Sequence, residues 1–162
     1  MNKVIYNKFD KSRISQLPRV TFPGRIVVIL NETEAEKAVD YLLSRDIIGV
    51  DTETRPVFKK GHRRKVALLQ ACDHDVCFLF RLNYIGIPDC IKMFLEDTTV
   101  PKVGLSLSDD MLMLHQRANF KPGYFIDLQD YVKSLGIEDM SLQKLYANVF
   151  HERITKRQQL SN

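Results

Sequence analysis

The sequence lacks several features that would assign it to a specialised class of protein. No apolar run approaches the roughly 20 residues that a membrane-spanning helix needs. The first eight residues have no apolar segment of the kind found in a signal peptide. There are only three cysteines, Cys72, Cys77 and Cys90, and this odd number argues against a disulfide framework. We therefore expect a cytoplasmic protein with no membrane partner.

What the chain does contain is typical of a globular domain. Of its 162 residues, 44% are apolar and 27% are charged, which suits one domain with its own hydrophobic core. The net charge of +4 and the pI of about 9.0 weakly favour an anionic partner. Residues 1–24 have no clean periodicity, and we expect an extended N-terminal arm there, followed by a domain over 25–162.

The apolar pattern predicts alternating strands and helices. Thr33 and Glu36 form a capping-box pattern at the start of one helix, and Asp127 and Ser141 are expected to cap two later ones. Strands are expected at 25–30, 47–53, 66–71, 76–82, 102–106 and 124–126, and helices at 33–45, 88–96, 107–117, 128–135 and 141–150. This order predicts an α/β fold with a mixed sheet, an antiparallel meander followed by parallel strands, and helices on both faces.

Two carboxylates stand at the end of the most apolar strand. The segment Ile47–Glu53 reads Ile-Ile-Gly-Val-Asp-Thr-Glu, so Asp51 and Glu53 follow a buried run and point to the same face of the sheet. Two acids so placed repel each other and are costly to desolvate. A hard divalent cation would neutralise them, although an acidic strand end that caps a loop remains an alternative.

A third acid, Asp110, is expected to join this pair. It lies in the helix that follows the strand 102–106. If this strand and 47–53 are parallel neighbours, their carboxyl ends meet at the same edge of the sheet. Its neighbour Asp109 is rotated away and is expected to be solvated. The alternative for both acids is a favourable interaction with the helix dipole.

These segments resemble the DEDD 3′–5′ exonucleases, in the branch of RNase D and the Werner-syndrome-type exonuclease domain. The acidic strand with its following hairpin is similar to the first motif, and the segment that ends at Asp110 is similar to the second. The resemblance covers roughly residues 25–162 and is carried by five segments: 47–56, 65–70, 77–80, 102–110 and 141–145.

The resemblance implies an RNase H-like fold and hydrolysis of phosphodiester bonds from the 3′ end of a nucleic acid. In the two-metal mechanism of this family, two Mg²⁺ or Mn²⁺ ions about 3.5–4 Å apart act on the attacking and leaving oxygens. By analogy, Asp51 would bridge both ions, while Glu53 and Asp110 would each hold one of them. Thr52 would offer its backbone to the terminal nucleotide.

The loop that follows the acidic strand is strongly basic. Residues 57–65 contain Lys60 among several other lysines and arginines, and Arg55 comes just after the acids. These two side chains are candidates for contact with the substrate's phosphates. A solvated surface turn explains the same composition equally well.

The chain departs from the family pattern in one respect. The third motif, Tyr-x-x-x-Asp, is expected beyond the helix at 141–150, but Tyr146 is followed by Phe150 where the aspartate is needed. We expect a fragment of a longer product, with a degenerate relative as the alternative. A non-catalytic nucleic-acid-binding module and a protein-interaction domain are therefore kept as rival functions.

Overall fold

The structure is a computed structural model that describes residues 3–54 and 65–155. The chain forms two compact units. One unit consists of Met1–Phe22 together with Gln129–Asn162, and the other unit spans Pro23–Leu128. None of the helices within the described residues is both long enough and apolar enough to cross a membrane.

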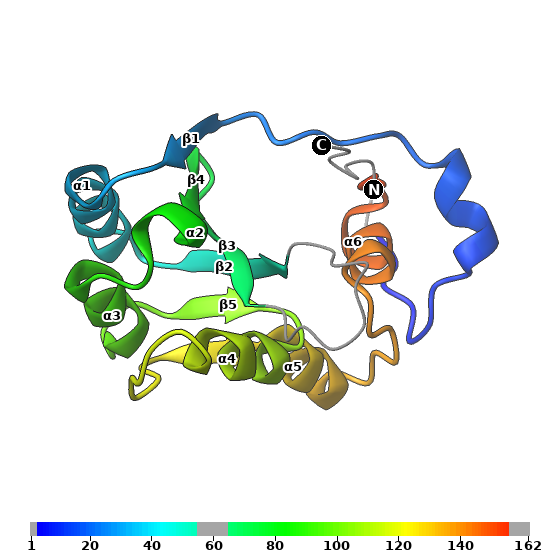
Figure 1. Cartoon of the computed structure of the whole chain (residues 1–162). Coiled ribbons are helices and arrows are strands. Elements are labelled where there is room, and N and C mark those ends of the chain that lie inside the picture. Colours follow the sequence, from blue (N-terminus) through cyan, green and yellow to red (C-terminus); the bar gives the residue numbers. More distant parts are fainter. Residues whose placement is uncertain (1–2, 55–64, 156–162) are drawn as a thin grey trace, which may run out of the picture. The chain divides into compact units, whose positions relative to one another are not determined.

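The unit Pro23–Leu128 is built on one six-stranded mixed sheet (Figure 1), which confirms the predicted fold class. The strands lie in the order β1-β4-β3-β2-β5-β6. Strand β3 pairs antiparallel with both β2 and β4, whereas β5 pairs parallel with β2 and β6. The strand bounds are β1 Arg25–Ile29, β2 Ile48–Thr54, β3 Val66–Cys72, β4 Val76–Arg81, β5 Lys102–Gly104 and β6 Phe125–Asp127.

The helices of this unit pack their apolar stripes onto the buried side chains of the sheet. They are α1 Glu32–Leu43, the short α2 Leu82–Ile85, α3 Asp89–Glu96 and α4 Leu107–His115; α5 Leu128–Ser134 begins at the last residue of the unit. On α3, the side chains of Ile91, Phe94 and Leu95 are buried, as the helical spacing predicted. Helix α2 was not predicted, because a single turn has no periodicity to detect.

The predicted capping box of α1 was displaced by two residues. The N-cap is Asn31, whose side chain accepts a hydrogen bond from the Glu34 amide at 2.9 Å. The Glu34 carboxylate in turn accepts from the Leu30 amide at 3.2 Å. Both the observed and the predicted pairs match the cap-plus-three pattern, so local sequence alone could not choose between them.

The other unit gathers the two ends of the chain around a small core. It contains a 3₁₀ helix, η1 Lys11–Gln16, and the helix α6 Leu142–Phe150, which Ser141 caps as predicted. Phe9, Ile14 and Ala147 are buried together. The predicted extended arm is thus partly helical and contributes side chains to a core.

A buried polar cluster holds the first residues of the chain in this unit. The carboxylate of Asp139 accepts hydrogen bonds from the Phe9 amide and from the Asn148 side chain, both at 3.0 Å. Asn148 also bonds the backbone of Tyr6 on both sides, accepting from its amide at 2.8 Å and donating to its carbonyl at 2.6 Å. Buried polar groups are stable only when they are hydrogen-bonded, so this cluster fixes residues 6–9 against α6.

Strand β2 lies inside the sheet, between β3 and β5 (Figure 1), and this position determines where its acids lie. Ile48 is fully buried and pairs with Lys102 at the start of the parallel strand β5. Since β2 and β5 run in the same direction, the end of β2 and the start of α4 lie at the same edge of the sheet.

Candidate active site

The end of β2 presents three polar side chains in alternation. Asp51 and Glu53 are exposed and share one face of the strand, whereas Thr52 is half-buried on the opposite face. The pairing of β2 with β3 changes register between Glu53 and Thr54. The regular strand therefore ends just as the acids are presented.

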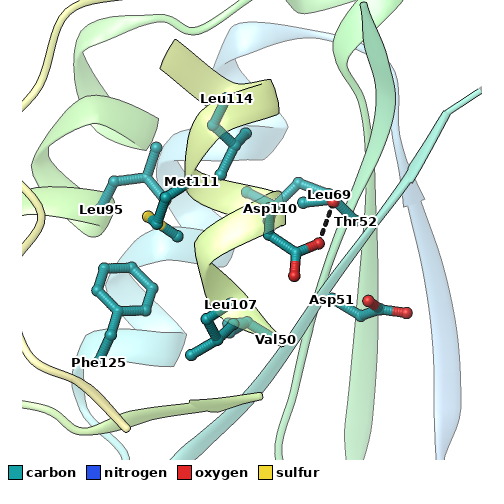
Figure 2. Close-up of a pocket in the computed structure, with 10 residues that line it drawn as sticks. All are labelled: Val50, Asp51, Thr52, Leu69, Leu95, Leu107, Asp110, Met111, Leu114 and Phe125. Carbon is teal, nitrogen blue, oxygen red and sulfur yellow. Dashed lines mark hydrogen bonds between the residues drawn. The ribbon is translucent and has the colours of Figure 1, made fainter. Parts of the chain in front are cut away.

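Helix α4 brings Asp110 to Thr52. The Thr52 hydroxyl donates a hydrogen bond to the Asp110 carboxylate, and this contact joins β2 to the first turn of α4 (Figure 2). Asp110 is half-buried, while Asp109, one residue earlier, is exposed as predicted. Figure 2 shows the Asp51 carboxyl turned away from that of Asp110, on the far side of the strand.

A small pocket joins these polar groups to the apolar interior (Figure 2). Asp51, Thr52 and Asp110 line it together with seven apolar side chains: Val50, Leu69, Leu95, Leu107, Met111, Leu114 and Phe125. The pocket is lined mainly by apolar side chains, which cannot solvate a negative charge.

The pKa values of both acids respond to this environment. Loss of hydration raises the pKa of Asp51 to about 6, although its side chain is still accessible to solvent, and the charges of Asp110 and Glu53 act in the same direction. Burial also raises the pKa of Asp110. The hydrogen bond from Thr52 opposes that rise, while the charge of Asp109 adds to it.

No lysine or arginine of the described residues forms an ion pair with these acids. The salt bridges that the structure describes are Arg45–Asp73 and Lys102–Asp97, both away from the pocket. Within residues 3–54 and 65–155, no three histidine, cysteine or acidic side chains lie close enough to hold one ion together. Asp51 and Asp110 are thus both among the residues that line the pocket, although their carboxyls point to opposite sides of β2, and Glu53 shares the face of Asp51 but lies outside the lining.

The predicted site residues are thus placed unevenly. Asp51, Thr52 and Asp110 are brought together, and Glu53 lies one strand position from Thr52. Arg55 and Lys60 lie outside the described residues. Sequence reasoning assigned Thr52 a backbone role and missed its hydroxyl. The alternation of the strand was the available signal, because it directs residue 52 to the face opposite the two acids.

These features define a class: an RNase H-like α/β domain with acids where two parallel strands end. A model of the 3′-5′ exonuclease family matches residues 26–162, and the chain belongs to that family. Its relatives confirm the 3′-5′ exonuclease family that the motifs predicted.

Two curated relatives and one solved structure illustrate the likeness. The chain is 29% identical over 148 residues to the mouse (Mus musculus) bifunctional 3′-5′ exonuclease/ATP-dependent helicase WRN, covering 86% of this chain and 11% of that protein. It is 33% identical over 123 residues to a 3′-5′ exonuclease of Arabidopsis thaliana, covering 67% of this chain and 43% of that protein. The chain therefore spans less than half the length of either relative.

The solved structure supports the fold. The Aedes aegypti Nibbler EXO domain superposes with a TM-score of 0.72 at 15% identity, covering 90% of this chain and 77% of that domain. At this identity the likeness concerns the arrangement of the elements.

Proposed function

We propose that this chain is the catalytic part of a metal-dependent 3′-5′ exonuclease that hydrolyses the phosphodiester bonds of a nucleic acid. The observation that carries the proposal is the pair Asp51 and Asp110. Both residues line one pocket at the sheet edge, both carboxyls have raised pKa values, and no cation of the described residues neutralises them. Family membership supports the same reaction.

The donor chemistry of the site fits a divalent cation. Carboxylate oxygens are the ligands that Mg²⁺ and Mn²⁺ prefer, and a bound cation would offset the loss of hydration and the neighbouring negative charges that raise the pKa of Asp51. We propose that Asp51, Glu53 and Asp110 hold two such ions. When bound, these ions supply a water of lowered pKa and stabilise negative charge on the phosphate oxygens.

The chain's own residues then have distinct tasks. Thr52 holds the Asp110 carboxyl in place through its hydroxyl. Its backbone, at the end of β2, is proposed to contact the terminal nucleotide. Arg55 and Lys60 are proposed to contact substrate phosphates, an interaction that salt would weaken.

The proposed substrate is a single-stranded 3′ end of DNA or RNA. The mouse relative is by name both an exonuclease and a helicase, which supports nucleic acid as the class of substrate. The net charge of +4 favours the same anionic partner. We propose the cytoplasm as its location, on the basis of the odd number of cysteines.

The test follows a 5′-labelled single-stranded oligonucleotide in the presence of Mn²⁺ or EDTA. The unchanged chain, Asp51→Asn and Asp110→Asn are compared, and any longer natural product of the same gene is assayed beside residues 1–162. We expect a ladder that shortens from the 3′ end with Mn²⁺ and disappears with EDTA. Either substitution should slow cleavage at least about 100-fold, since a bound cation contributes several kcal/mol to the transition state.

Asp109→Asn is the matched control, because it removes the same charge one residue away from an exposed position. It should leave the ladder close to that of the unchanged chain. Equal loss in Asp109→Asn and Asp110→Asn would reject the assigned site. Tight, EDTA-insensitive binding of the oligonucleotide without any ladder, in every chain tested, would instead identify a non-catalytic nucleic-acid-binding module.

A further inference from the structure

Asp127 makes a contact that its place in the sequence did not predict. It ends strand β6, where it is the register partner of Gly104 on β5. We predicted that it would cap the helix that follows it. Its two carboxylate oxygens also accept hydrogen bonds from the backbone amides of Ser106 at 3.1 Å and Leu107 at 2.9 Å, about twenty residues earlier.

These two amides belong to a turn that needs support. Ser106 is the N-cap of α4 and adopts φ 59°, in the left-handed region, which costs a non-glycine residue roughly 1–2 kcal/mol. Its side chain makes no capping hydrogen bond to the helix. Asp127 therefore supplies both the acceptors and the negative charge that the start of a helix favours.

The supported turn is the one that places Asp110. Leu107, whose amide Asp127 binds, is buried and lines the same pocket as Asp110, three residues further along α4. Gly104 allows this close packing: a Cβ there would lie 2.8 Å from the Val50 carbonyl oxygen and closer still to the Leu107 side chain. A change in the first turn of α4 would therefore displace Asp110 from Thr52.

We propose that Asp127 is a positioning residue, which fixes the start of α4 and thereby holds Asp110 in its place beside β2. It binds no substrate or ion itself. This inference rests on the proposed function, because positioning matters only if Asp110 is a ligand. Asp127 is thus a further acid, separate from Asp51 and Asp110, that acts on the site through the backbone at the start of α4.

The test compares Asp127→Asn with Asp97→Asn. Asparagine has the same shape as aspartate but only one oxygen, so it can accept from only one of the two amides. Asp97 serves as the control for a general loss of stability: its carboxylate accepts from the amides of Thr99 at 3.1 Å and Val100 at 2.8 Å, both at one oxygen, and lies 3.6 Å from the Lys102 ammonium group. Both substitutions should lower the unfolding temperature.

Only Asp127→Asn should change the ion site. We expect the dissociation constant for Mn²⁺, measured by titration calorimetry without substrate, to rise about tenfold, as is common when a group that orients a metal ligand is altered. The Mn²⁺ concentration that half-saturates cleavage should rise in parallel, while the KM for the oligonucleotide stays close to that of the unchanged chain. Equal Mn²⁺ affinity in Asp127→Asn, Asp97→Asn and the unchanged chain would overturn the proposal.

Hydrogen exchange separates this inference from the proposed function. If the unchanged chain neither binds Mn²⁺ nor cleaves, the proposed function fails, and exchange of the α4 amides alone decides. Faster exchange over residues 107–115 in Asp127→Asn, with unchanged rates there in Asp97→Asn, would support the positioning role. Unchanged exchange over α4 in both variants would reject it.

Discussion

The two ends of strand β5 differ in whether their charged side chains have partners of opposite charge. At its start, the side chain of Lys102 is fully buried, and its ammonium group donates to the carbonyls of Asp97 at 2.9 Å and Val100 at 3.1 Å. The carboxylate of Asp97 lies 3.6 Å away, and the rings of Phe94 and Phe125 lie within 5.5 Å. Beyond its other end, Asp110 and Asp51 line one pocket with no cation of the described residues paired to them.

The contrast distinguishes a charge that supports the fold from charges that are available for a ligand. Burial lowers the pKa of Lys102, but the nearby Asp97 opposes that shift, so every charge-bearing group there has a partner. Burial raises the pKa of Asp51 and Asp110, and their acidic neighbours raise it further. Titratable groups with uncompensated shifts gather at functional sites.

The largest effect on stability should come from replacing Lys102, the buried lysine at the start of β5. Lys102→Met keeps the length of the side chain but leaves two buried carbonyls without their donor. We expect the free energy of unfolding to fall by about 2–4 kcal/mol, measured by urea denaturation. The Mn²⁺ affinity of the folded protein should not change, since Lys102 lies at the opposite end of β5 from the acids.

Asp89→Asn provides a control for the loss of one charge, because Asp89 lies on the same side of the unit, in the first turn of α3, without a described ion pair. Its unfolding midpoint should stay within the range of ordinary surface substitutions. If Lys102→Met unfolded at the same urea concentration as the unchanged chain, the hydrogen bonds of Lys102 would not stabilise the fold, and the two ends of β5 would not differ in the way described.

The sequence predicted the strand arrangement at the acidic end of this comparison but not the burial at the basic one. Apolar runs predicted two strands, crossover rules made those strands parallel, and Asp51 and Asp110 line the pocket where they end. Lys102 gave no such signal, since a lysine at the start of a strand is usually exposed. Its burial depends on Asp97 and two aromatic rings, which only the folded chain assembles.

Long-range polar contacts account for most of what was missed. The sequence pattern did not predict that Asp127 accepts from the amides of Ser106 and Leu107 at the start of α4. It made no prediction for Asn148, which is fully buried and bonded to Tyr6 near the N-terminus. Local patterns report periodicity and turn chemistry, whereas contacts between distant segments depend on packing that a single sequence does not display.

A second, intermediate effect concerns pH. The pKa of Asp51 is about 6, against an ordinary value of 3.8, so between these two values the folded chain binds more protons than the unfolded one. Without metal, the stabilisation is present at pH values below 3.8 and is lost as the pH rises through about 6. Asp51→Asn should therefore unfold at a higher temperature than the unchanged chain at pH 7.5 in EDTA, but not at pH 4.

Protonation of Asp51 should stabilise the metal-free fold but weaken the binding of Mn²⁺. A carboxylate must be deprotonated to hold a cation, so Mn²⁺ affinity should weaken as the pH falls below about 6. Thermal unfolding with and without Mn²⁺ at several pH values measures both trends. A metal-free chain that becomes steadily more stable from pH 4 to pH 7, with no difference from Asp51→Asn, would show that burial does not perturb Asp51.

The smallest effect should come from removing the hydrogen bond that Asp110 accepts from the Thr52 side chain. Thr52→Val keeps the branched shape that suits a strand and removes the hydroxyl that donates to Asp110. Because this bond lowers the pKa of Asp110, its loss should raise that pKa further and weaken Mn²⁺ binding at pH 6 more than at pH 8. Stability should fall by about 1 kcal/mol, the typical net contribution of one hydrogen bond. Thr52→Ser retains the donor and should restore both Mn²⁺ binding and its pH dependence. If the serine and valine substitutions behaved alike, the position of Asp110 would depend on the start of α4 rather than on β2, and the support for this acid would come from Asp127 alone.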